Sequence, residues 1–452
     1  MTAMPVDLPL DLPADAPAAP AGLLLAYSGG LDSSVLLHRL AAEPRWRQTG
    51  LRAVHVHHGL QPGADAWAAH CGATCAALGV PLEVVRVQVA AATGLGLEAA
   101  ARQARYAALE ERLAPGEWLL TAHHLDDQAE TFLLRALRAS GPEGLAAMRP
   151  LRRFGPGWHW RPLLDCPRAA LLDWARARGL DWIEDPSNAQ PDPERNFLRL
   201  EVLPLLRRRW PQAAAALARS AALSAEANTL LESADQALLA PMLEPGGQVL
   251  ALPPLLDQPA ARRARLLRLW VRGLGLPPLP ARGVEAIEGQ LLHARGDAQP
   301  CFAWAGARLL RWRGRLHADW QRAPLPAGWS CSWDGRAPLE LPDGGRLQLC
   351  DAGGRAAPAG FAEPLRVAAR QGGERLRMPG RAHRHALKHL LQDAGIPPWE
   401  RAGLPLLWHG SADAAELLAA GDRIVAAPLQ SWLQARGLRL HWQPPRGRPG
   451  AR

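Results

Sequence analysis

The chain has 452 residues, of which 48% are hydrophobic and 21% are charged, so the composition favours about two to four packed domains over wholesale disorder. No stretch approaches roughly 18 consecutive apolar residues, and the sequence therefore predicts no membrane-spanning helix. The formal net charge of +9 favours a polyanionic partner such as RNA. Nearly all basic residues are arginines, however, and an arginine-rich surface can also reflect a GC-biased genome.

The first 20 residues contain Asp7, Asp11 and Asp15 but no Lys or Arg, which argues against a signal or transit peptide and predicts a flexible tail over 1–20. From residue 21 to about 140, strand-like runs alternate with segments of helical periodicity. The expected strands are Leu23–Tyr27, Leu51–His57, Leu82–Val89 and Glu117–Ala122, and the expected helices are Ser33–Ala42, Ala64–Leu78, Leu97–Leu113 and Asp126–Arg138. This alternation predicts an α/β fold, an open parallel sheet covered by helices, in which ligands bind beyond the carboxyl ends of the strands.

The junction between the first strand and the first helix reads Ser28-Gly29-Gly30-Leu31-Asp32-Ser33. A helix N-terminus offers unpaired N–H groups, glycines let phosphate oxygens approach the backbone, and the serines add hydroxyl donors. The pattern is not GxxxxGK[ST], so this is not the P-loop of kinases and GTPases. Asp32 would repel bare phosphate, but it suits a Mg²⁺ ion held between the carboxylate and the phosphates. The alternative is an ordinary capped turn.

Polar residues also follow the fourth predicted strand. His123-His124 precede Asp126-Asp127 at the start of a helix, where acidic residues are also ordinary helix-start chemistry. Metal binding by the two histidines is disfavoured because adjacent side chains point to different faces. On the preceding helix, Arg102 and Arg105 share a face, which suits either a solvated surface or a guanidinium clamp on phosphates.

The rest of the chain predicts a loop over 150–162, a helix over Pro167–Arg178, and a short helix with Arg195 and Arg199 on one face. Residues 211 to about 295 have helical patterns, 296–365 are broken by Gly and Pro with short strand-like pieces such as Arg346–Cys350, and 365–443 have a compact α/β pattern. These patterns predict a catalytic domain, a mainly helical middle domain and a small α/β C-terminal domain. The expected boundaries are 21–214, 215–330 and 355–443.

A basic cluster lies in the C-terminal region and includes the single lysine of the chain. Its members are Arg370, Arg375, Arg377, Arg381, Arg384 and Lys388. Such clusters position a phosphate backbone without reading its sequence, and a solvated basic face is the alternative. Trp399 could stack on a base, but the two prolines before it favour a packing anchor.

The SGGxDS loop after a first strand resembles the PP-loop of ATP pyrophosphatases. Three further segments resemble the tRNA(Ile)-lysidine synthetase family more specifically: HVHHGL at 55–60, EAAARQARY at 98–106 and HHLDDQAETFLLRALRASGPEGLAAM at 123–148. The resemblance is strong over 21–210 and good over 365–430. It departs at Ala139-Ser140, where a small pair replaces the Arg-Gly more frequent in the family.

The resemblance implies ATP-dependent ligation of L-lysine to C2 of the wobble cytidine of a tRNA(Ile) with a CAU anticodon. An adenylated tRNA is the implied intermediate, and pyrophosphate and AMP are released. The loop Ser28–Ser33 would bind ATP, and Asp32 and Asp127 would hold Mg²⁺. Asp126 is a further catalytic candidate, and Arg102 or Arg105 would stabilise the phosphate charge. Arg195, Arg199 and the C-terminal basic cluster would contact tRNA. The oligomeric state stays open, with a homodimer as one option.

Two other functions are compatible with parts of the sequence. A tRNA thiolase shares the PP-loop, but it needs a persulfide-carrying cysteine, often in a CxxC pair. The six cysteines at 71, 75, 166, 301, 331 and 350 form neither a CxxC pair nor a zinc pattern, and they are typical of a reducing compartment, hence the cytoplasm. A non-catalytic RNA-binding protein is disfavoured because the loop keeps all its polar residues.

Overall fold

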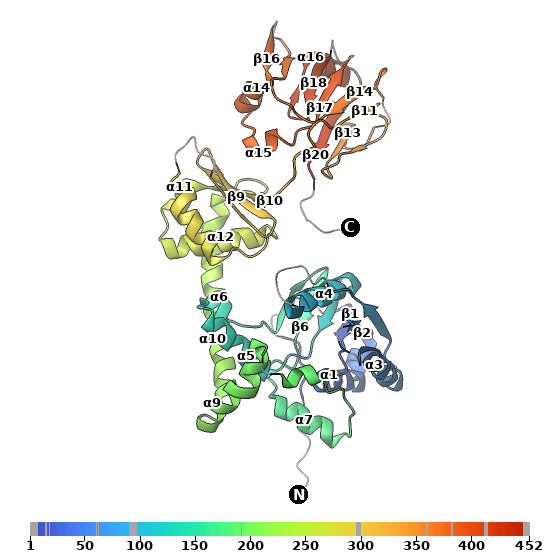
Figure 1. Ribbon diagram of the computed structural model, residues 1–452, viewed down its shortest axis with the longest axis vertical. Helices are drawn as coiled ribbons and strands as arrows, with labels where there is room; N and C mark the ends of the chain where they lie inside the picture. The colour runs from blue at the N-terminus through green and yellow to red at the C-terminus, as the bar shows by residue number, and fades with distance from the viewer. Residues whose placement is uncertain are drawn as a thin grey trace. The chain divides into compact units, whose positions relative to one another are not determined.

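The computed structural model describes residues 8–13, 16–17, 19–59, 61, 63–89, 97–190, 192–294, 300–357, 360–380, 383–410 and 415–445. The chain divides into two compact units, Met1–Leu231 and Glu232–Arg452. Figure 1 shows the elements of both units. Within the described ranges, no helix combines the length and apolar character that crossing a bilayer requires.

The first unit is built on a six-stranded sheet with the order β3-β2-β1-β4-β6-β5. All neighbouring pairs are parallel except β5–β6, which is an antiparallel hairpin at one edge. The strands are β1 (Gly22–Ala26), β2 (Leu51–His57), β3 (Leu82–Arg86), β4 (Glu117–Leu120), β5 (Leu151–Phe154) and β6 (Gly157–Trp160). The direction of strand progression reverses between β1 and β4, and open α/β sheets bind ligands beyond the carboxyl ends of the strands at such a switch point.

The prediction of a parallel sheet is confirmed, but the prediction of a loop over 150–162 is wrong. Residues 151–160 form the β5–β6 hairpin, and β6 extends the sheet by pairing with β4. Trp160 is 1% exposed and packs edge-to-face against Trp118. The Gly and Trp content that indicated a loop therefore belongs to a tight turn and to buried aromatic residues.

Helices cover both faces of this sheet (Figure 1). Leu23 and Leu25 of β1 face a core that includes α1, α3 and α7, whereas Leu24 faces a core that includes α4. A central strand that is apolar on both faces is typical of a parallel sheet. The helices up to this point are α1 (Leu31–Ala42), α2 (Pro44–Gln48), α3 (Ala64–Leu78), α4 (Leu97–Arg112), α5 (Leu125–Leu137), α6 (Pro142–Leu145) and α7 (Arg168–Ala177).

Part of the predicted flexible tail is packed on the first unit. Leu8 and Leu10 are 2% and 1% exposed and join the core on the α1 side of the sheet. The carbonyl of Leu8 accepts two hydrogen bonds from the Arg39 guanidinium, and that of Leu10 accepts one from Arg45. The tail prediction is therefore wrong for this segment, because apolar burial and guanidinium donors hold its backbone.

After α7 the chain returns to α5 through a segment with a break in its helical pattern. It comprises the 3₁₀ turn η1 (Pro186–Ala189), α8 (Glu194–Phe197), the π-helical η2 (Leu198–Val202), α9 (Leu203–Arg209) and the start of α10 (Ala213–Leu239). Pro204 has no N–H group to continue an α-helical ladder, which accounts for the local change of pitch. Leu203 and Ala214 pack against Ala129 of α5, so the whole segment is anchored beside the sheet's carboxyl edge.

The second unit contains a middle core that combines helices with a four-stranded antiparallel sheet of order β7-β10-β9-β8. Leu266, Leu267 and Trp270 of α12 belong to one core with Leu309 and Leu316 of the sheet. The middle region therefore has the predicted helices and, in addition, a sheet that the sequence indicated only through short strand-like pieces between Gly and Pro residues. Its elements are η3 (Ala240–Met242), β7 (Val249–Ala251), α11 (Leu252–Leu256), α12 (Ala260–Gly273), α13 (Ala281–Ala286), η4 (Ile287–Leu291), β8 (Cys301–Trp304), β9 (Ala307–Trp312) and β10 (Arg315–Trp320).

The C-terminal core is mixed α/β and starts earlier than predicted. Strands β11 and β13 pair with β14 and β20 in two antiparallel sheets, so the expected start at residue 355 is too late. The strand-like piece expected at Arg346–Cys350 is confirmed as β13, but its long-range pairing with β20 could not be read from the local pattern. The elements are β11 (Ser330–Trp333), β12 (Leu339–Glu340), β13 (Arg346–Cys350), β14 (Leu365–Ala368), β15 (Arg375–Arg377), β16 (Arg384–Ala386), α14 (Leu387–Asp393), α15 (Pro398–Arg401), β17 (Leu406–His409), β18 (Glu416–Ala420), β19 (Ile424–Val425), α16 (Ala427–Gln434) and β20 (Arg439–Gln443).

Candidate active site

The loop between β1 and α1 is held in a fixed shape by its own polar groups. Gly29 has a φ of +82°, and a Cβ atom there would lie 2.4 Å from Ile183 Cδ1 and 2.9 Å from Cys71 Sγ. The Ser28 and Ser33 hydroxyls lie 3.0 Å apart, and Ser33 Oγ donates to the Gly30 carbonyl. Gly30 is the N-cap of α1 without a side-chain cap, so the first N–H groups of that helix are free to receive an anion.

Asp32 on α1 and Asp127 on α5 flank the same buried histidine, His124. His124 Nε2 lies 3.6 Å from Asp32 Oδ2 and 3.5 Å from Asp127 Oδ2, and its Nδ1 accepts the Asp127 N–H. Burial lowers the pKa of His124, but the hydrogen bond to Asp32 and the charges of the neighbouring aspartates outweigh burial and raise that pKa above its ordinary value. The histidine therefore joins the ends of β1 and β4 electrostatically.

One oxygen of Asp32 has no hydrogen-bond partner. Asp32 Oδ1 is buried and unpartnered among the described residues, and Arg168 Nε, at 3.9 Å, is too distant for a hydrogen bond. A buried carboxylate oxygen without a donor is costly in the free protein. No group of three or more potential metal-ligand side chains occurs within the described ranges, so a cation here would need further oxygen ligands from outside the protein.

Asp126 points away from this pair and serves the structure around it. Its Oδ2 accepts the N–H of Arg168 at 2.9 Å, and its Oδ1 is bonded to the Arg207 guanidinium. Burial opposes ionisation of Asp126, but these two donors outweigh burial and lower its pKa. Both acceptor oxygens are thus occupied, and Asp126 holds the N-terminus of α7 and the end of α9 against α5.

Two predicted tRNA-binding arginines lie on the carboxylates of α5. Arg195 and Arg199 each donate to both Asp127 and Glu130, at distances of 2.7–3.2 Å. Glu130 is fully buried, so its charge depends on these guanidiniums. Removing one partner from such a network leaves an uncompensated buried charge. The arrangement fixes α8 and η2 beside the PP-loop, and the contact of these arginines with tRNA stays a prediction.

Arg102 and Arg105 of α4 bring further positive charge into the surroundings of Arg195. Both guanidiniums contact the ring of Tyr106, with centroid distances of 5.1 and 5.5 Å. Burial lowers the pKa of Arg105, and the charges of Arg102 and Arg195 lower it further. The α4 arginines and Arg195 therefore act on one another electrostatically, and a guanidinium clamp on phosphates stays a prediction.

A neutral histidine network follows strands β4 and β6. Arg161 donates to His159 Nδ1 at 3.2 Å, His159 Nε2 lies 2.8 Å from Thr121 Oγ1, and that hydroxyl lies 2.7 Å from His123 Nδ1. Burial and the charges of Arg161 and Arg152 lower the pKa of His159 to about 2. His159 is therefore neutral, and it can accept from Arg161 while it donates to Thr121. The chain thus places several arginines together without adding buried positive charge.

The C-terminal basic cluster is partly exposed and partly structural. Arg377 lies directly opposite Arg384 on the β15–β16 hairpin, and Arg375 is two residues away on the same face. All three side chains are exposed and have no carboxylate partner among the described residues. Arg370 differs, because its Nε donates to the buried Glu374 at 3.2 Å. Lys388 is exposed on α14, and Arg381 lies outside the described residues.

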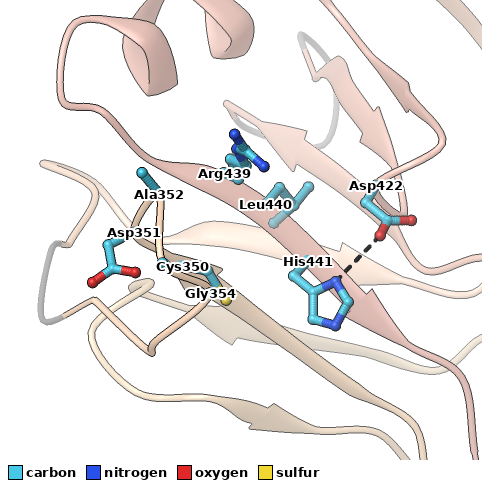
Figure 2. A pocket seen from close by; sticks show the side chains of 9 residues that line it. Cys350, Asp351, Ala352, Gly354, Asp422, Arg439, Leu440 and His441 are labelled. Atoms are coloured by element: carbon cyan, nitrogen blue, oxygen red, sulfur yellow. Dashed lines mark ion pairs between the residues drawn. The ribbon is translucent and has the colours of Figure 1, made fainter.

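A hollow of about 520 Å³ lies over β13 and β20 in the C-terminal domain (Figure 2). Asp351 and Asp422 lie on opposite sides of it. Asp351 Oδ1 accepts the N–H of Arg355, and Asp422 Oδ2 accepts that of Trp442 and lies 3.6 Å from His441 Nδ1. The carboxylates are thus used within the domain, and two acidic groups do not suit a phosphate backbone. Trp399 packs against His317 at 5.0 Å, as expected for an anchor.

Three family models match the chain: a PP-loop domain over residues 12–206, a TilS substrate binding domain over 250–317 and a TilS substrate C-terminal domain over 365–442. The tRNA(Ile)-lysidine synthase of Xanthomonas axonopodis pv. citri is 58% identical over 424 residues, which are 94% of each chain. The chain belongs to the tRNA(Ile)-lysidine synthase family. The Xylella fastidiosa (Temecula1) and Pseudomonas putida (KT2440) synthases are 55% and 45% identical, covering 93% and 94% of this chain and 95% and 96% of the relatives.

Membership of the tRNA(Ile)-lysidine synthase family confirms the resemblance seen in the sequence and makes the chain an enzyme with an ATP-binding PP-loop. The structure brings together the PP-loop, Asp32 and Asp127, and it places Arg195 and Arg199 beside them. Sequence reasoning missed the central position of His124, for which the i, i+3 spacing to Asp127 was a signal. It also missed Arg168 and Arg207, whose contacts with Asp32 and Asp126 depend on tertiary structure alone.

Proposed function

We propose that this enzyme uses ATP to join L-lysine to C2 of the wobble cytidine of a tRNA(Ile) with a CAU anticodon. The cytidine O2 attacks the α-phosphorus of ATP, and pyrophosphate leaves. The ε-amine of lysine then attacks C2, and AMP departs with the former O2. The observation that carries this proposal is the unpartnered Asp32 Oδ1 beside a PP-loop that leads into a helix N-terminus without a side-chain cap. The reaction is expected in the cytoplasm.

The PP-loop is the proposed site for the pyrophosphate end of ATP. The free N–H groups at the start of α1 and the paired hydroxyls of Ser28 and Ser33 provide donors for phosphate oxygens. Gly29 is required because the neighbouring Ile183 and Cys71 leave no space for a side chain. Leu31 contributes its N–H group within the first turn, while its side chain is buried in the core.

Asp32 and Asp127 are the proposed ligands of Mg²⁺. The unpartnered Asp32 Oδ1 fits a cation, and Mg²⁺ typically takes one or two carboxylates together with phosphate oxygens and water. When bound, Mg²⁺ would neutralise charge on the phosphates of ATP. His124 holds both aspartates at a common distance from its Nε2, and it therefore orients the two carboxylates before substrates arrive.

Arg102 and Arg105 are proposed to stabilise the negative charge on the α-phosphate during attack by the cytidine. Their guanidiniums are preoriented by the Tyr106 ring, which reduces the cost of ordering them in the transition state. Asp126 is proposed to act as a positioning residue, because the Arg168 N–H and the Arg207 guanidinium hold its carboxylate against α7 and α9. Arg195, Arg199 and the C-terminal cluster are proposed to contact tRNA.

A tRNA thiolase is not favoured by any feature of the site. Cys71 lies next to the PP-loop, but burial and the neighbouring Cys75 raise its pKa to about 12, and burial raises that of Cys75 to about 11. Protonated, buried thiols are poor nucleophiles and poor persulfide carriers. The cysteines nearest the loop therefore do not provide the reactive thiolate that a thiolase needs.

The deciding experiment incubates the purified protein with ATP, Mg²⁺, radiolabelled lysine and unmodified tRNA(Ile) with a CAU anticodon. Elongator tRNA(Met) is the matched control because it shares this anticodon. Label in tRNA(Ile) alone is the expected result. Release of AMP and pyrophosphate without label would retain adenylation but overturn lysine as the nucleophile, and the absence of both would overturn the proposal.

A further inference from the structure

The segment that carries Arg195 and Arg199 presents apolar side chains to solvent next to the catalytic region. Phe197, Leu200, Leu205 and Trp210 are 50%, 39%, 62% and 60% exposed. Isolated exposed apolar residues are normal, but several in one short segment indicate an interaction surface. The two arginines of the same segment are bonded to Asp127 and Glu130, so this segment is held against the carboxylates of α5.

Trp210 is the largest residue of this surface and borders a groove. The groove has a volume of about 480 Å³ and is lined by Trp210, Pro211, Leu206 and Leu217 with Arg209 and Gln212. Clefts of about 300–1,000 Å³ with mostly apolar walls are typical of small-ligand or base-sized sites. We define Arg208, Arg209, Trp210 and Leu217 as the Trp210 patch.

The charge of the Trp210 patch favours an anionic occupant. Arg207 is bonded to Asp126, but the next two residues, Arg208 and Arg209, are exposed and have no acidic partner in the described part of the chain. In a two-fold contact between copies, equivalent surfaces face each other, so these arginines would meet their own counterparts. An RNA loop suits both the exposed arginines and the exposed tryptophan, because it offers phosphates to the guanidiniums and base faces to the aromatic ring.

The proposed chemistry requires such a surface. A base that reacts must leave its stack, and the neighbouring nucleotides then lose a stacking partner. Resting on the proposed function, we propose that Trp210 stacks on a base of the tRNA loop adjacent to the reacting cytidine, while Arg208 and Arg209 hold the flanking phosphates. Trp210 is thus a positioning residue for the nucleic-acid substrate and does not touch ATP or lysine.

The test compares Trp210→Ala with Trp210→Phe in the full-length protein. Trp210→Ala should raise the tRNA Kd and the KM for tRNA roughly 5- to 100-fold, the range expected for loss of one base–aromatic stack. The kcat at saturating tRNA and the KM values for ATP and lysine should stay within about twofold of wild type. Trp210→Phe should recover most of the affinity, because any aromatic ring can stack. Leu230→Ala, at a residue that is 76% exposed, is the matched control and should change nothing.

A second arm measures tRNA binding without catalysis at several salt concentrations. Arg208→Ala and Arg209→Ala should each reduce the slope of log Kd against log salt by about one. This arm separates the two proposals, since a chain that binds tRNA through the patch but incorporates no lysine would overturn only the proposed reaction. Wild-type tRNA affinity in Trp210→Ala would overturn the inference. Unchanged affinity together with a loss of self-association would instead make the patch an interface between copies.

Discussion

In the catalytic unit, Arg195 and Arg199 are bonded to the carboxylates of Asp127 and Glu130, whereas Arg377 and Arg384 face each other across a C-terminal hairpin. The first pair neutralises buried negative charge. The second pair has no carboxylate partner among the described residues, and like charges opposite each other destabilise a strand pair. The difference teaches that arginines of this chain fall into two groups. Those paired with buried carboxylates hold the site together, and those without a carboxylate partner in the described ranges are the ones we propose to contact a polyanion.

Asp32 differs from Asp127 and Glu130 because its Oδ1 has no hydrogen-bond partner among the described residues. Its substitution gives the largest expected effect. Asp32→Ala should lower the rate of adenylate formation about 1,000-fold, since one preorganised electrostatic contact contributes about 10²- to 10³-fold. It should leave tRNA affinity within a few-fold and lower stability by no more than about 1–2 kcal/mol, because Oδ1 has no bond to the protein and only the Oδ2 contact with His124 is lost. ATP–pyrophosphate exchange, tRNA binding and denaturant unfolding measure the three quantities.

The matched control is Asp65→Ala. Asp65 is an exposed aspartate of the same unit that pairs with Arg86, and its removal should leave adenylation unchanged. Normal turnover in Asp32→Ala would remove Asp32 from the proposed metal site.

A substitution of Glu130 tests whether the buried ion pairs of Arg195 and Arg199 stabilise the protein. Glu130→Gln leaves Arg195 and Arg199 with Asp127 as a single shared carboxylate, and it should lower the free energy of unfolding by about 2–3 kcal/mol. This is below the ~3–5 kcal/mol typical of a fully buried pair, because both arginines are partly exposed. Urea unfolding is the measurement.

Glu194→Gln is the control for Glu130→Gln, since Glu194 pairs with Arg138 on the surface. An exposed pair of this kind should cost less than about 1 kcal/mol. Equal effects of the two substitutions would show that burial does not distinguish the two ion pairs.

Much of this fold could be predicted from sequence, because local periodicity fixes it. The ranges of β2 and α3 match the predictions residue for residue, since each has a clear apolar pattern and a turn at either end. The β5–β6 hairpin and the sheet of the middle region were missed because their pairing is distant or their composition resembles a loop. The C-terminal start was placed too late for the same reason.

The candidate site was predictable only as a set of residue types at strand ends. The topology rule places the ends of β1 and β4 together, and this rule brought Asp32 near Asp127 in the prediction. Periodicity does not reveal which of Asp126 and Asp127 faces the loop, because both lie in the first turn of α5. That distinction depends on Arg168 and Arg207, which come from α7 and α9.

His159 differs from both groups of arginines, because it is a buried base that stays neutral beside Arg161 and Arg152. Its pKa in the folded protein, about 2, lies below the ordinary value of about 6.5. Below pH ~6.5 the unfolded chain therefore binds more protons, and stability should fall as the pH falls, by up to about 1.4 kcal/mol per pH unit from this residue. His159→Gln, which can still accept from Arg161 and donate to Thr121, should remove that part of the slope between pH 6 and 5. Denaturant unfolding at each pH checks this, with exposed His383→Gln as the control; an unchanged slope in His159→Gln would assign the acid sensitivity elsewhere.

The smallest expected effect comes from the uncompensated arginines. Arg377→Ala should weaken tRNA binding about tenfold, as expected for one charge-assisted contact, and should lower the salt slope by about one. The free protein should be unchanged or stabilised by about 0.2–1 kcal/mol, because repulsion from Arg384 is relieved. Arg346→Ala is the control, since Arg346 already pairs with Glu340 and should contribute little to RNA affinity. A variant that loses stability and keeps its tRNA affinity would place Arg377 with the structural arginines, and the contrast between the two regions would then fail.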